Sequence, residues 1–413
     1  MITGTKIRAG LIGGKLGHSF SPRIHAALAD YPYDLIELEE QEVGAFLQKG
    51  DFDALNVTIP YKKTVMPYLA EISPEATRIG AVNTILRRPD GSLIGHNTDY
   101  AGFSDTVRDC GVSLCGKKVV ILGSGGASRT AITVATDMGA RAVVVISRNG
   151  ADNYENLHLH ADAEVLINAT PVGMYPKNGV SPVSLAVFPH LEAVLDMIYN
   201  PARTALLMEA EERGIPYRNG LLMLVSQARR AAELFLNTQI DDGEVKAVAD
   251  SIARDTENII LIGMPGCGKT TLGKQIAALT GRRFVDCDDE LVKTAGKPIP
   301  QIFAEDGEET FRALETATLG ALAAESGLVI ATGGGVVTRP RNYPLMHQNG
   351  RILFLDTPPD ALPTDGRPLS QKKTPAVLYA ERLPLYRQMA DEVIPVSRCV
   401  EDNVKLIMEV LKQ

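Results

Sequence analysis

The sequence predicts an α/β protein with more than one domain and largely parallel sheets. Short apolar runs alternate with segments of helical spacing, which is the order that βαβ units produce. The succession of strand, glycine-rich turn and helix occurs twice, in residues 117–149 and 258–281. With 413 residues the chain is also too long for one ordinary core, so two or three domains are expected.

Residues 1–240 contain seven runs with strand character. They are IRAGLIGG, YDLIELE, DALNVTIP, KKVVILGSGG, RAVVVISR, AEVLINATP and AVLDMIY. Residues 221–240 predict a helix with few breakers, and residues 241–257 are polar and charged. We place the main boundary near 250–257. The alternative is that 241–257 forms only a connecting helix within one large domain.

The charge balance favours small molecules as partners. A net charge of −8 argues against nucleic acid or an anionic membrane as the main partner, although a few placed Arg and Lys side chains can still bind small anions. The start of the chain lacks a signal-peptide pattern, and no apolar stretch of about 18 residues occurs elsewhere. We therefore expect a cytoplasmic protein without a membrane partner. Its oligomeric state stays open, with a homodimer as one option.

The five cysteines predict neither a disulfide framework nor a zinc site, because they are scattered and form no CxxC pair. Cys267 is distinctive because it lies within a phosphate-binding loop, where a nearby lysine and a helix N-terminus favour the thiolate. A small filler and a redox-sensitive thiol are both compatible with this position, and the first is the simpler interpretation.

The turn GMPGCGKTT, residues 263–271, matches the phosphate-binding pattern G-x-x-x-x-G-K-[ST]. The apolar run NIILI precedes it and a helical segment follows, which is the context that the pattern requires. Backbone N–H groups and the helix N-terminus surround phosphate oxygens, Lys269 adds a full charge, and the Thr270 hydroxyl can ligate Mg²⁺. The residues expected to bind the nucleotide are Gly263, Gly266, Gly268, Lys269, Thr270 and Thr271. A nucleoside triphosphate is thus predicted, with the phosphate acceptor left open.

The first glycine-rich turn predicts a dinucleotide-binding (Rossmann) unit. Gly123 allows the tight turn, Gly125 allows close approach of the pyrophosphate, and the helix opens near Gly126 and Ala127. Ser128 occupies the place of the third glycine of the usual fingerprint, so the strand–turn–helix context carries this prediction.

The end of the second strand favours NADP over NAD. An acidic side chain there would bind a ribose 2′-hydroxyl, whereas Ser147 and Arg148 suit a 2′-phosphate. The alternative is that Arg148 only faces solvent at a strand end.

Further motifs surround the first turn in a fixed order. They are GHSFSP (17–22), NVTIPYKK (56–63), GAVNT (80–84), GHNTDYAGF (95–103), INATPVGM (167–174), MIYNP (197–201) and GLLMLVSQA (220–228). In this order they resemble shikimate dehydrogenase, across about residues 5–240. Each residue taken singly also has a local explanation: Ser21-Pro22 suits a helix start, Asn83 a turn and Gln227 a solvated helix face.

The resemblance implies reduction of 3-dehydroshikimate to shikimate with NADPH. Lys62 and Asp99 match the catalytic pair of the family. Whether Lys62 donates the proton or mainly anchors charge stays open, because a neutral lysine requires burial or nearby cations. The resemblance also implies that Ser19 and Ser21 hold the substrate carboxylate. The groups implied to meet the ring hydroxyls or carbonyl are Asn56, Thr58, Asn83, Asp99 and Gln227.

A second set of motifs follows the phosphate-binding loop. They are FVDCDDEL (284–291), IFAEDGEETFRALE (302–315), TGGGVVTR (332–339), GRPL (366–369) and ERLPLYRQMAD (381–391). In this order they resemble shikimate kinase, across about residues 257–413. The acceptor is then expected to be the alcohol that the first part makes.

The second resemblance implies a role for each charged group. Asp286 would help hold Mg²⁺, and Asp288 would position or deprotonate the attacking hydroxyl. Arg312 and Arg382 would bind the shikimate carboxylate, and Arg367 would close over the phosphates. Backbone of Gly333, Gly334 and Gly335 would approach the substrate. One lysine, three arginines and a metal supply the positioning and charge that phosphoryl transfer requires.

The expected architecture is therefore a fused two-activity enzyme. Residues 1–104, completed by 220–250, form the substrate domain; 105–219 form the NADP-binding Rossmann domain; and 257–413 form a P-loop kinase domain with a parallel sheet. Two departures from the families stand out: a shortened passage after ISRN, and no arginine before the lid motif GRPL. The alternatives are a quinate or NAD enzyme acting in breakdown, and a chain with one half degenerate as a sensor.

Overall fold

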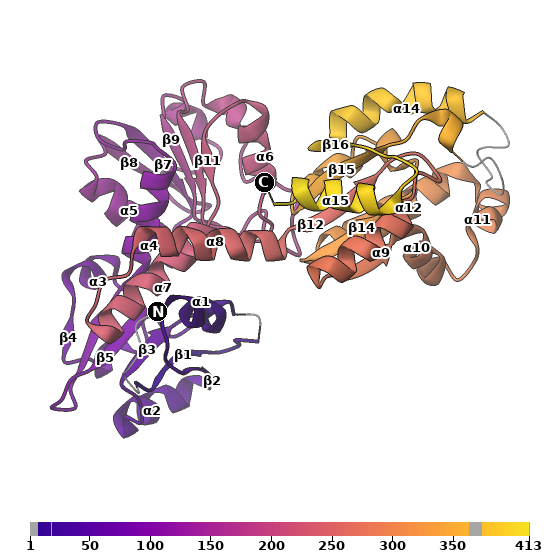
Figure 1. Ribbon diagram of the computed structural model, residues 1–413. Coiled ribbons are helices and arrows are strands. Elements are labelled where there is room, and N and C mark those ends of the chain that lie inside the picture. The colour runs from indigo at the N-terminus through magenta and orange to yellow at the C-terminus, as the bar shows by residue number, and fades with distance from the viewer. Residues whose placement is uncertain (1–6, 18, 363–373, 413) are drawn as a thin grey trace. The chain divides into compact units, whose positions relative to one another are not determined.

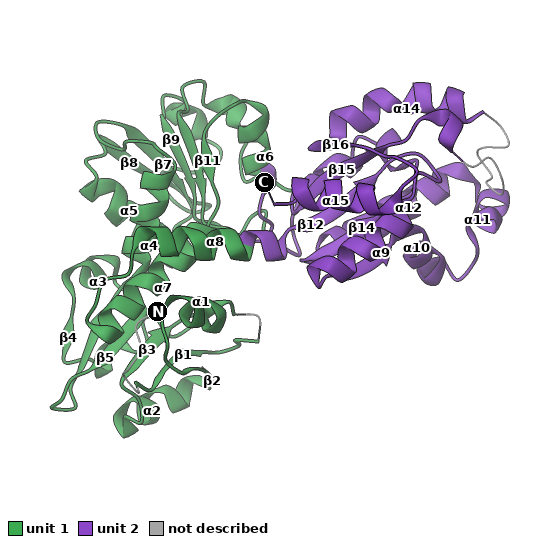
Figure 2. Ribbon diagram, in the orientation of Figure 1, with its two compact units in different colours: residues 1–174, 180–199, 206–252 green, residues 175–179, 200–205, 253–413 purple. Residues whose placement is uncertain are grey.

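The computed structural model describes residues 7–17, 19–362 and 374–412. Figure 1 shows the chain coloured along its length, with the labels used below. The chain divides into two compact units, the first formed by residues 1–174, 180–199 and 206–252, and the second by residues 175–179, 200–205 and 253–413 (Figure 2). Each unit combines helices with predominantly parallel strands, so the predicted α/β class is confirmed.

The first unit contains a six-stranded sheet in the order β2-β1-β3-β5-β6-β4. Its strands are β1 (Ala9–Gly13), β2 (Tyr33–Glu37), β3 (Ala54–Val57), β4 (Glu71–Ile72), β5 (Thr84–Arg87) and β6 (Leu93–His96). Strand β5 runs antiparallel to both β3 and β6, whereas the other pairs are parallel. The sequence did not reveal this reversal. Its consequence is that the start of β5 lies at the same edge as the ends of β3 and β6.

A second, five-stranded sheet of the first unit is parallel throughout, in the order β11-β10-β9-β7-β8. Its strands are β7 (Lys118–Leu122), β8 (Ala142–Ile146), β9 (Val165–Asn168), β10 (Ala193–Asp196) and β11 (Tyr217–Arg218). Between β8 and β9 the described chain forms only one short 3-10 helix, η3 (Leu157–His160). The shortened passage seen in the sequence thus leaves β8 at the sheet edge.

Helices cover these two sheets and connect them. They are α1 (Ser21–Leu28), α2 (Val43–Lys49), α3 (Pro74–Ile79), α4 (Asp99–Asp109), α5 (Gly126–Asp137), α6 (Ala205–Glu212), α7 (Leu221–Leu236) and α8 (Asp242–Thr256). Helix α7 packs against both α4 and α1. It ends at Leu236 and is capped by Asn237, whose positive φ of 48° is the left-handed conformation that asparagine tolerates. The polar stretch 241–257 is helical, and the two units divide inside this helix, between residues 252 and 253.

The second unit contains a five-stranded parallel sheet in the order β13-β14-β12-β15-β16. Its strands are β12 (Asn258–Ile262), β13 (Arg283–Asp286), β14 (Leu328–Ala331), β15 (Gly350–Asp356) and β16 (Glu392–Pro395). Its helices are α9 (Lys269–Thr280), α10 (Cys287–Ala295), α11 (Ile299–Glu305), α12 (Gly307–Ala323), α13 (Asn342–His347), α14 (Pro375–Met389) and α15 (Val400–Val410). Every residue of the central strand β12 is buried, as the apolar run predicts.

Two short segments from earlier in the chain belong to the second unit. The Tyr175 hydroxyl donates to the carbonyl of Ala323 at 3.1 Å, and the Arg203 guanidinium donates to the carbonyl of His347 at 2.5 Å. These bonds hold residues 175–179 and 200–205 within that unit. Among the described residues, no helix combines the length and apolar composition that crossing a membrane requires.

Candidate active sites

A cavity of about 540 Å³ in the first unit collects polar side chains from distant parts of the chain. The loops after β1, β3 and β6 and the start of β5 meet here because they share one edge of the sheet. Helix α7 closes another side. The eight side chains expected at the dehydrogenase site all line this cavity: Ser19, Ser21, Asn56, Thr58, Lys62, Asn83, Asp99 and Gln227.

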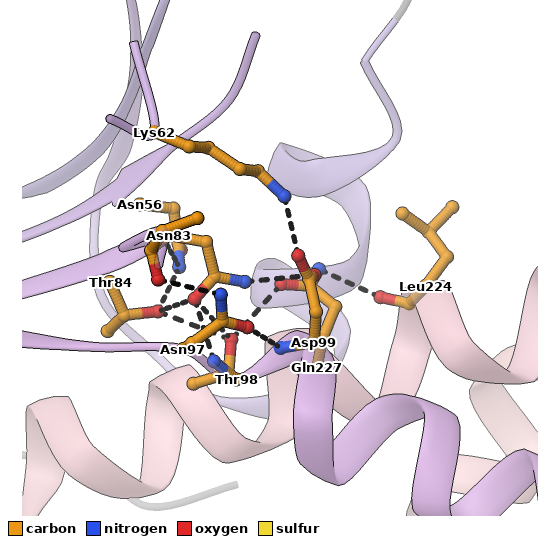
Figure 3. Close-up of polar contacts among 10 residues, drawn as sticks. Asn56, Lys62, Asn83, Thr84, Asn97, Thr98, Asp99, Leu224 and Gln227 are labelled. Atoms are coloured by element: carbon orange, nitrogen blue, oxygen red, sulfur yellow. Dashed lines mark hydrogen bonds and ion pairs between the residues drawn. The ribbon is translucent and has the colours of Figure 1, made fainter. Parts of the chain in front are cut away.

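Lys62 and Asp99 form an ion pair at the wall of this cavity (Figure 3). The distance from Lys62 Nζ to Asp99 Oδ2 is 2.5 Å, and the two side chains keep 30% and 18% of their surface exposed. Asp99 is the first residue of α4, where the helix dipole favours a negative charge. The pair is therefore a charged donor and acceptor that remain accessible from the cavity.

The amide of Asn83 fixes the position of the Asp99 carboxylate. Asn83 Oδ1 accepts from the backbone N–H of Thr98 at 2.7 Å, which determines how the amide is oriented. Its Nδ2 must then face Asp99 Oδ1, to which it donates at 2.9 Å. The backbone N–H of Asp99 is in turn bound by Asn97 Oδ1 at 3.1 Å (Figure 3). Asn83 is thus part of a structured network rather than only a turn former.

Helix α7 brings Gln227 to the same network through a close approach to α4. A Cβ placed on Gly102 would lie 2.5 Å from the carbonyl oxygen of Met223, so only glycine permits this packing. Gln227 Oε1 lies 3.4 Å from the Thr98 hydroxyl, and its Nε2 donates to the carbonyl of Leu224 at 2.9 Å. The glycine in GHNTDYAGF therefore has a packing role.

The two serines come from the loop after β1 and the start of α1. Ser21 is the first residue of α1 and is followed by proline, so it does begin a helix, as its alternative interpretation requires. Ser19 Oγ accepts from the backbone N–H of Ser21 at 3.2 Å. Both side chains nevertheless border the cavity, so the structural and the binding roles are compatible.

The glycine turn after β7 has the geometry of a pyrophosphate cradle. Gly123 has a φ of +102°, and a Cβ there would lie 3.1 Å from the carbonyl oxygen of Ala169. Nothing lies within 4 Å of a Cβ built on Gly125 or Gly126, so the space above the start of α5 is open. Ala127 is the second residue of that helix, whose first N–H groups lack intrahelical partners. These groups fit a dinucleotide.

Ser147 and Arg148 follow the edge strand β8. Arg148 is exposed. Burial raises the pKa of the neighbouring Tyr154, and the charge of Arg148 partly offsets this rise. The side chain is therefore available to an anion at this edge.

A second cavity, of about 560 Å³, lies at the carboxyl edge of the sheet in the second unit. Loops after β12, β13 and β14 border it. The predicted residues that line it are Gly266, Gly268, Lys269, Thr270, Thr271, Asp286, Asp288, Arg312, Gly333, Gly334, Gly335 and Arg382. Gly263, at the start of the loop, has a φ of +148° and is not part of the lining. Arg367 lies outside the described residues.

Lys269 is buried and turned back onto its own loop. Its Nζ donates to the carbonyls of Gly263 and Met264, each at 2.9 Å, and lies 3.7 Å from Cys267 Sγ. The Thr270 hydroxyl donates to Asp286 Oδ2 at 2.8 Å. Cys267 is buried, and all five cysteines are free thiols, so its redox role stays a hypothesis.

Asp288 lies among other acids. Burial has the largest effect on its pKa, followed by the negative charges of Asp286 and Glu315. Together they raise the pKa from 3.8 to about 6, and the positive charge of Lys269 partly offsets them. Glu315 itself is almost fully buried and accepts from Arg312 at 2.8 Å. A carboxyl group with a pKa near 6 exchanges protons readily near neutral pH.

The glycines of TGGGV make room for these side chains. A Cβ on Gly333 would lie 2.5 Å from Glu315 Oε1, and a Cβ on Gly335 would lie 2.1 Å from the Arg312 guanidinium. The carbonyl of Gly334 accepts from Arg382 at 2.9 Å and from the hydroxyl of Tyr386 at 2.5 Å. The Gly333–Gly335 loop is thus fixed by hydrogen bonds from Arg382 and Tyr386 and is not an isolated turn.

Comparison with known proteins identifies the family to which the first unit belongs. A model of the shikimate dehydrogenase substrate binding domain matches residues 11–85. The shikimate dehydrogenase (NADP(+)) of Clostridium beijerinckii is 37% identical over 252 residues, which cover 56% of this chain and 93% of that protein. The chain belongs to the shikimate dehydrogenase family.

Solved shikimate dehydrogenases share this fold. A chorismate mutase/shikimate 5-dehydrogenase fusion protein from Clostridium acetobutylicum is similar with a TM-score of 0.57 and 36% identity, covering 60% of this chain and 97% of that one. The Thermus thermophilus enzyme in complex with NADP(H) and shikimate is similar with a TM-score of 0.54 and 30% identity. The match covers 59% of this chain and 99% of that one.

The second unit contains a shikimate kinase domain, since the model of that family matches residues 265–412. The chain is therefore a bifunctional shikimate dehydrogenase and shikimate kinase, which carries two consecutive steps of the shikimate pathway. NADP and ATP are the nucleotides of these two activities.

Some residues of the shikimate dehydrogenase and kinase sites were not predicted. Glu315 lies three residues after Arg312, a spacing that puts both on one helix face and could have revealed the pair. Thr98 and Asn97 precede Asp99 in the quoted motif, yet no pattern shows that they bind Asn83 and the Asp99 backbone.

The raised pKa of Asp288 predicts a pH-dependent cost to the stability of the kinase unit. Since the folded pKa exceeds the unfolded value, the contribution of this carboxyl to stability is full below about pH 4 and is lost as the pH rises through about 6. In the presence of EDTA, Asp288→Asn should raise the free energy of unfolding of this unit at pH 8 by up to about 3 kcal/mol, and by less at lower pH. Urea denaturation at several pH values measures this difference.

Glu409→Gln is the matched control, since this side chain of α15 is exposed and is not one of the charges that shift the pKa of Asp288. The control should leave the pH dependence unchanged. An Asp288→Asn effect of the same size at pH 4 and pH 8 would contradict the explanation.

Proposed function

We propose that the first unit reduces 3-dehydroshikimate to shikimate with NADPH. The observation that carries this proposal is the Lys62–Asp99 pair, at 2.5 Å, in a cavity that also contains the other six expected substrate groups. When bound, NADPH supplies the hydride that reduces the ring ketone. Lys62 donates a proton from Nζ to the carbonyl oxygen, which becomes the 3-hydroxyl, and Asp99 holds the ammonium in place.

The remaining side chains of this cavity orient the substrate. We assign the carboxylate to the hydroxyls of Ser19 and Ser21, which are small donors at the start of α1. The ring hydroxyls are assigned to neutral amide and hydroxyl groups that bind without adding charge. These are Asn56, Thr58, Asn83 and Gln227. We assign Asp99, beside its partner Lys62, to the ring hydroxyls or carbonyl as well.

The second unit, in this proposal, transfers the γ-phosphate of ATP to the 3-hydroxyl of shikimate. Asp288, with its pKa near 6, accepts the hydroxyl proton as the oxygen attacks phosphorus. Lys269 turns from the loop carbonyls to the phosphates, where it offsets negative charge. Arg312 and Arg382 bind the shikimate carboxylate as planar forks, and Arg367 of the sequence motif closes over the phosphates.

The residues present also fit Mg²⁺. Thr270 Oγ1 and Asp286 Oδ2, 2.8 Å apart, are hard oxygen donors beside the phosphate-binding loop. The described residues contain no group of three or more His, Cys, Asp or Glu side chains that could form a protein-only metal cage. This fits Mg²⁺, which takes one or two protein ligands and completes its shell with water and phosphate oxygens. The ion would neutralise charge on the triphosphate.

The proposed domains follow from these roles. Residues 1–104, completed by 220–250, form the substrate domain, and 105–219 the NADP-binding domain. Residues 257–413 form the kinase. Gly123, Gly125, Gly126 and Ala127 bind the pyrophosphate, and Ser147 and Arg148 the 2′-phosphate. We also place the enzyme in the cytoplasm, and leave its oligomeric state, with a homodimer as one option, to measurement.

The two activities should be separable by single substitutions in the full chain. Lys62→Ala should lower the dehydrogenase kcat by about 100-fold or more, because it removes the proposed proton donor, and leave shikimate phosphorylation unchanged. Lys269→Ala should lower the kcat of shikimate phosphorylation and leave the dehydrogenase activity unchanged. Each variant is the folding control of the other. Steady-state assays of both activities on both proteins test this, and retained dehydrogenase activity in Lys62→Ala would contradict the assignment.

Cofactor choice should depend on Arg148. Arg148→Ala should raise the KM for NADPH by about 10-fold or more, because it removes a charged partner of the 2′-phosphate, and should leave the KM for NADH nearly unchanged. Arg141→Ala, at an exposed arginine before β8, is the control. An unchanged KM for NADPH would show that Arg148 only faces solvent, and equal rises in the KM for both cofactors would contradict a contact with the 2′-phosphate.

A further inference from the structure

Tyr33 lies behind the dehydrogenase cavity, in the edge strand β2, and is not among the residues that line it. Its hydroxyl is 2.7 Å from Asn56 Oδ1. Asn56 Nδ2 lies 3.3 Å from the carbonyl oxygen of Asn83, and a carbonyl can only accept. The nitrogen side of the amide therefore faces β5, the oxygen side faces Tyr33, and Tyr33 is the donor.

Burial keeps the hydroxyl of Tyr33 protonated, and the nearby Ser21 side chain offsets this only in part. Burial has the largest effect, and with the nearby Tyr31 it holds the pKa of Tyr33 well above its usual value. The phenol is thus protonated and remains a donor to Asn56.

The ring of Tyr33 is held by stacking. The imidazole of His25 lies parallel to it, with centroids 4.0 Å apart and planes at 13°. The same imidazole also stacks on the ring of Phe235, with centroids 6.0 Å apart and planes at 11°. Burial lowers the pKa of His25 to about 3, so this imidazole is neutral and adds no charge to the cluster. The Nδ1 of His25 is hydrogen-bonded to the Tyr31 hydroxyl at 2.5 Å. The Tyr33 hydroxyl therefore remains available to Asn56.

The network continues from Asn56 to the catalytic pair. Asn56 Nδ2 is 3.1 Å from Thr84 Oγ1, and this hydroxyl is 3.0 Å from Asn83 Oδ1. Asn83 in turn donates to Asp99 (Figure 3). An amide that is free to turn would break this sequence of bonds at its first member.

We propose that Tyr33 is a positioning residue of the dehydrogenase site, whose hydroxyl fixes the amide of Asn56 in the orientation that binds the substrate. The proposal rests on the proposed function. Tyr33 acts through Asn56 and does not touch the substrate. Its effect should therefore fall on substrate binding, because preorganised groups need no ordering when the ligand arrives.

Tyr33→Phe in the full chain tests this, since it removes one oxygen and keeps the stacked ring. In shikimate oxidation with NADP⁺, the KM for shikimate should rise about 3- to 10-fold, the range expected for one hydrogen bond. The kcat should change less than about 2-fold, and the KM for NADP⁺ and the kinase activity should not change. Tyr31→Phe is the matched control, because it removes a hydroxyl of the same cluster that is bonded to His25 instead of Asn56.

A double-mutant cycle with Asn56→Ala separates positioning from a general packing effect. Once Asn56 is truncated, Tyr33→Phe should raise the KM for shikimate by a clearly smaller factor. The same factor in both backgrounds, an unchanged KM in Tyr33→Phe, or an equal rise in Tyr31→Phe would overturn the proposal. If the wild-type chain did not oxidise shikimate with NADP⁺, the proposed function would fail, and the positioning role with it.

Discussion

Both sites depend on one constraint, which is that the ends of several strands meet at one edge of a sheet. In the first unit this edge gathers Thr58 and Lys62 after β3, and Asn97 and Asp99 after β6. The antiparallel β5 adds the residue before its start, Asn83, to the same edge. A strand in the other direction would carry that amide to the far edge, so the carboxylate of Asp99 would lose this partner.

The two carboxylates that we propose to act in catalysis lie in different surroundings. Asp99 begins a helix, is paired with Lys62 and accepts a hydrogen bond from Asn83. Asp288 lies near two other acids in a partly buried position, and its pKa rises to about 6. The first environment suits a group that holds an ammonium ion in place, and the second suits a group that accepts a proton. The product hydroxyl of one reaction is the nucleophile of the next.

Local patterns in the sequence were sufficient for strands β1–β3, β7–β10 and β12 and for the glycine turns, because apolar runs and glycine spacing are local signals. The predicted residues that line the two cavities came from the resemblance of the ordered motifs to two families. Contacts between distant residues were not predictable. The reversal of β5, the pairing of Tyr33 with Asn56, and the inclusion of residues 200–205 in the second unit all depend on tertiary packing. Glu315 was predictable only in part, since its helical spacing from Arg312 can be read from the sequence but its burial cannot.

The central claim is that one chain makes shikimate and then phosphorylates it. The most direct test gives the intact purified chain 3-dehydroshikimate, NADPH, ATP and Mg²⁺, and follows NADPH absorbance together with shikimate 3-phosphate. We expect one phosphate ester for each NADPH consumed at completion, and accumulation of shikimate when ATP is omitted. Consumption of NADPH without any phosphate ester in the complete mixture would contradict the account of the second unit, and no consumption of NADPH would contradict that of the first.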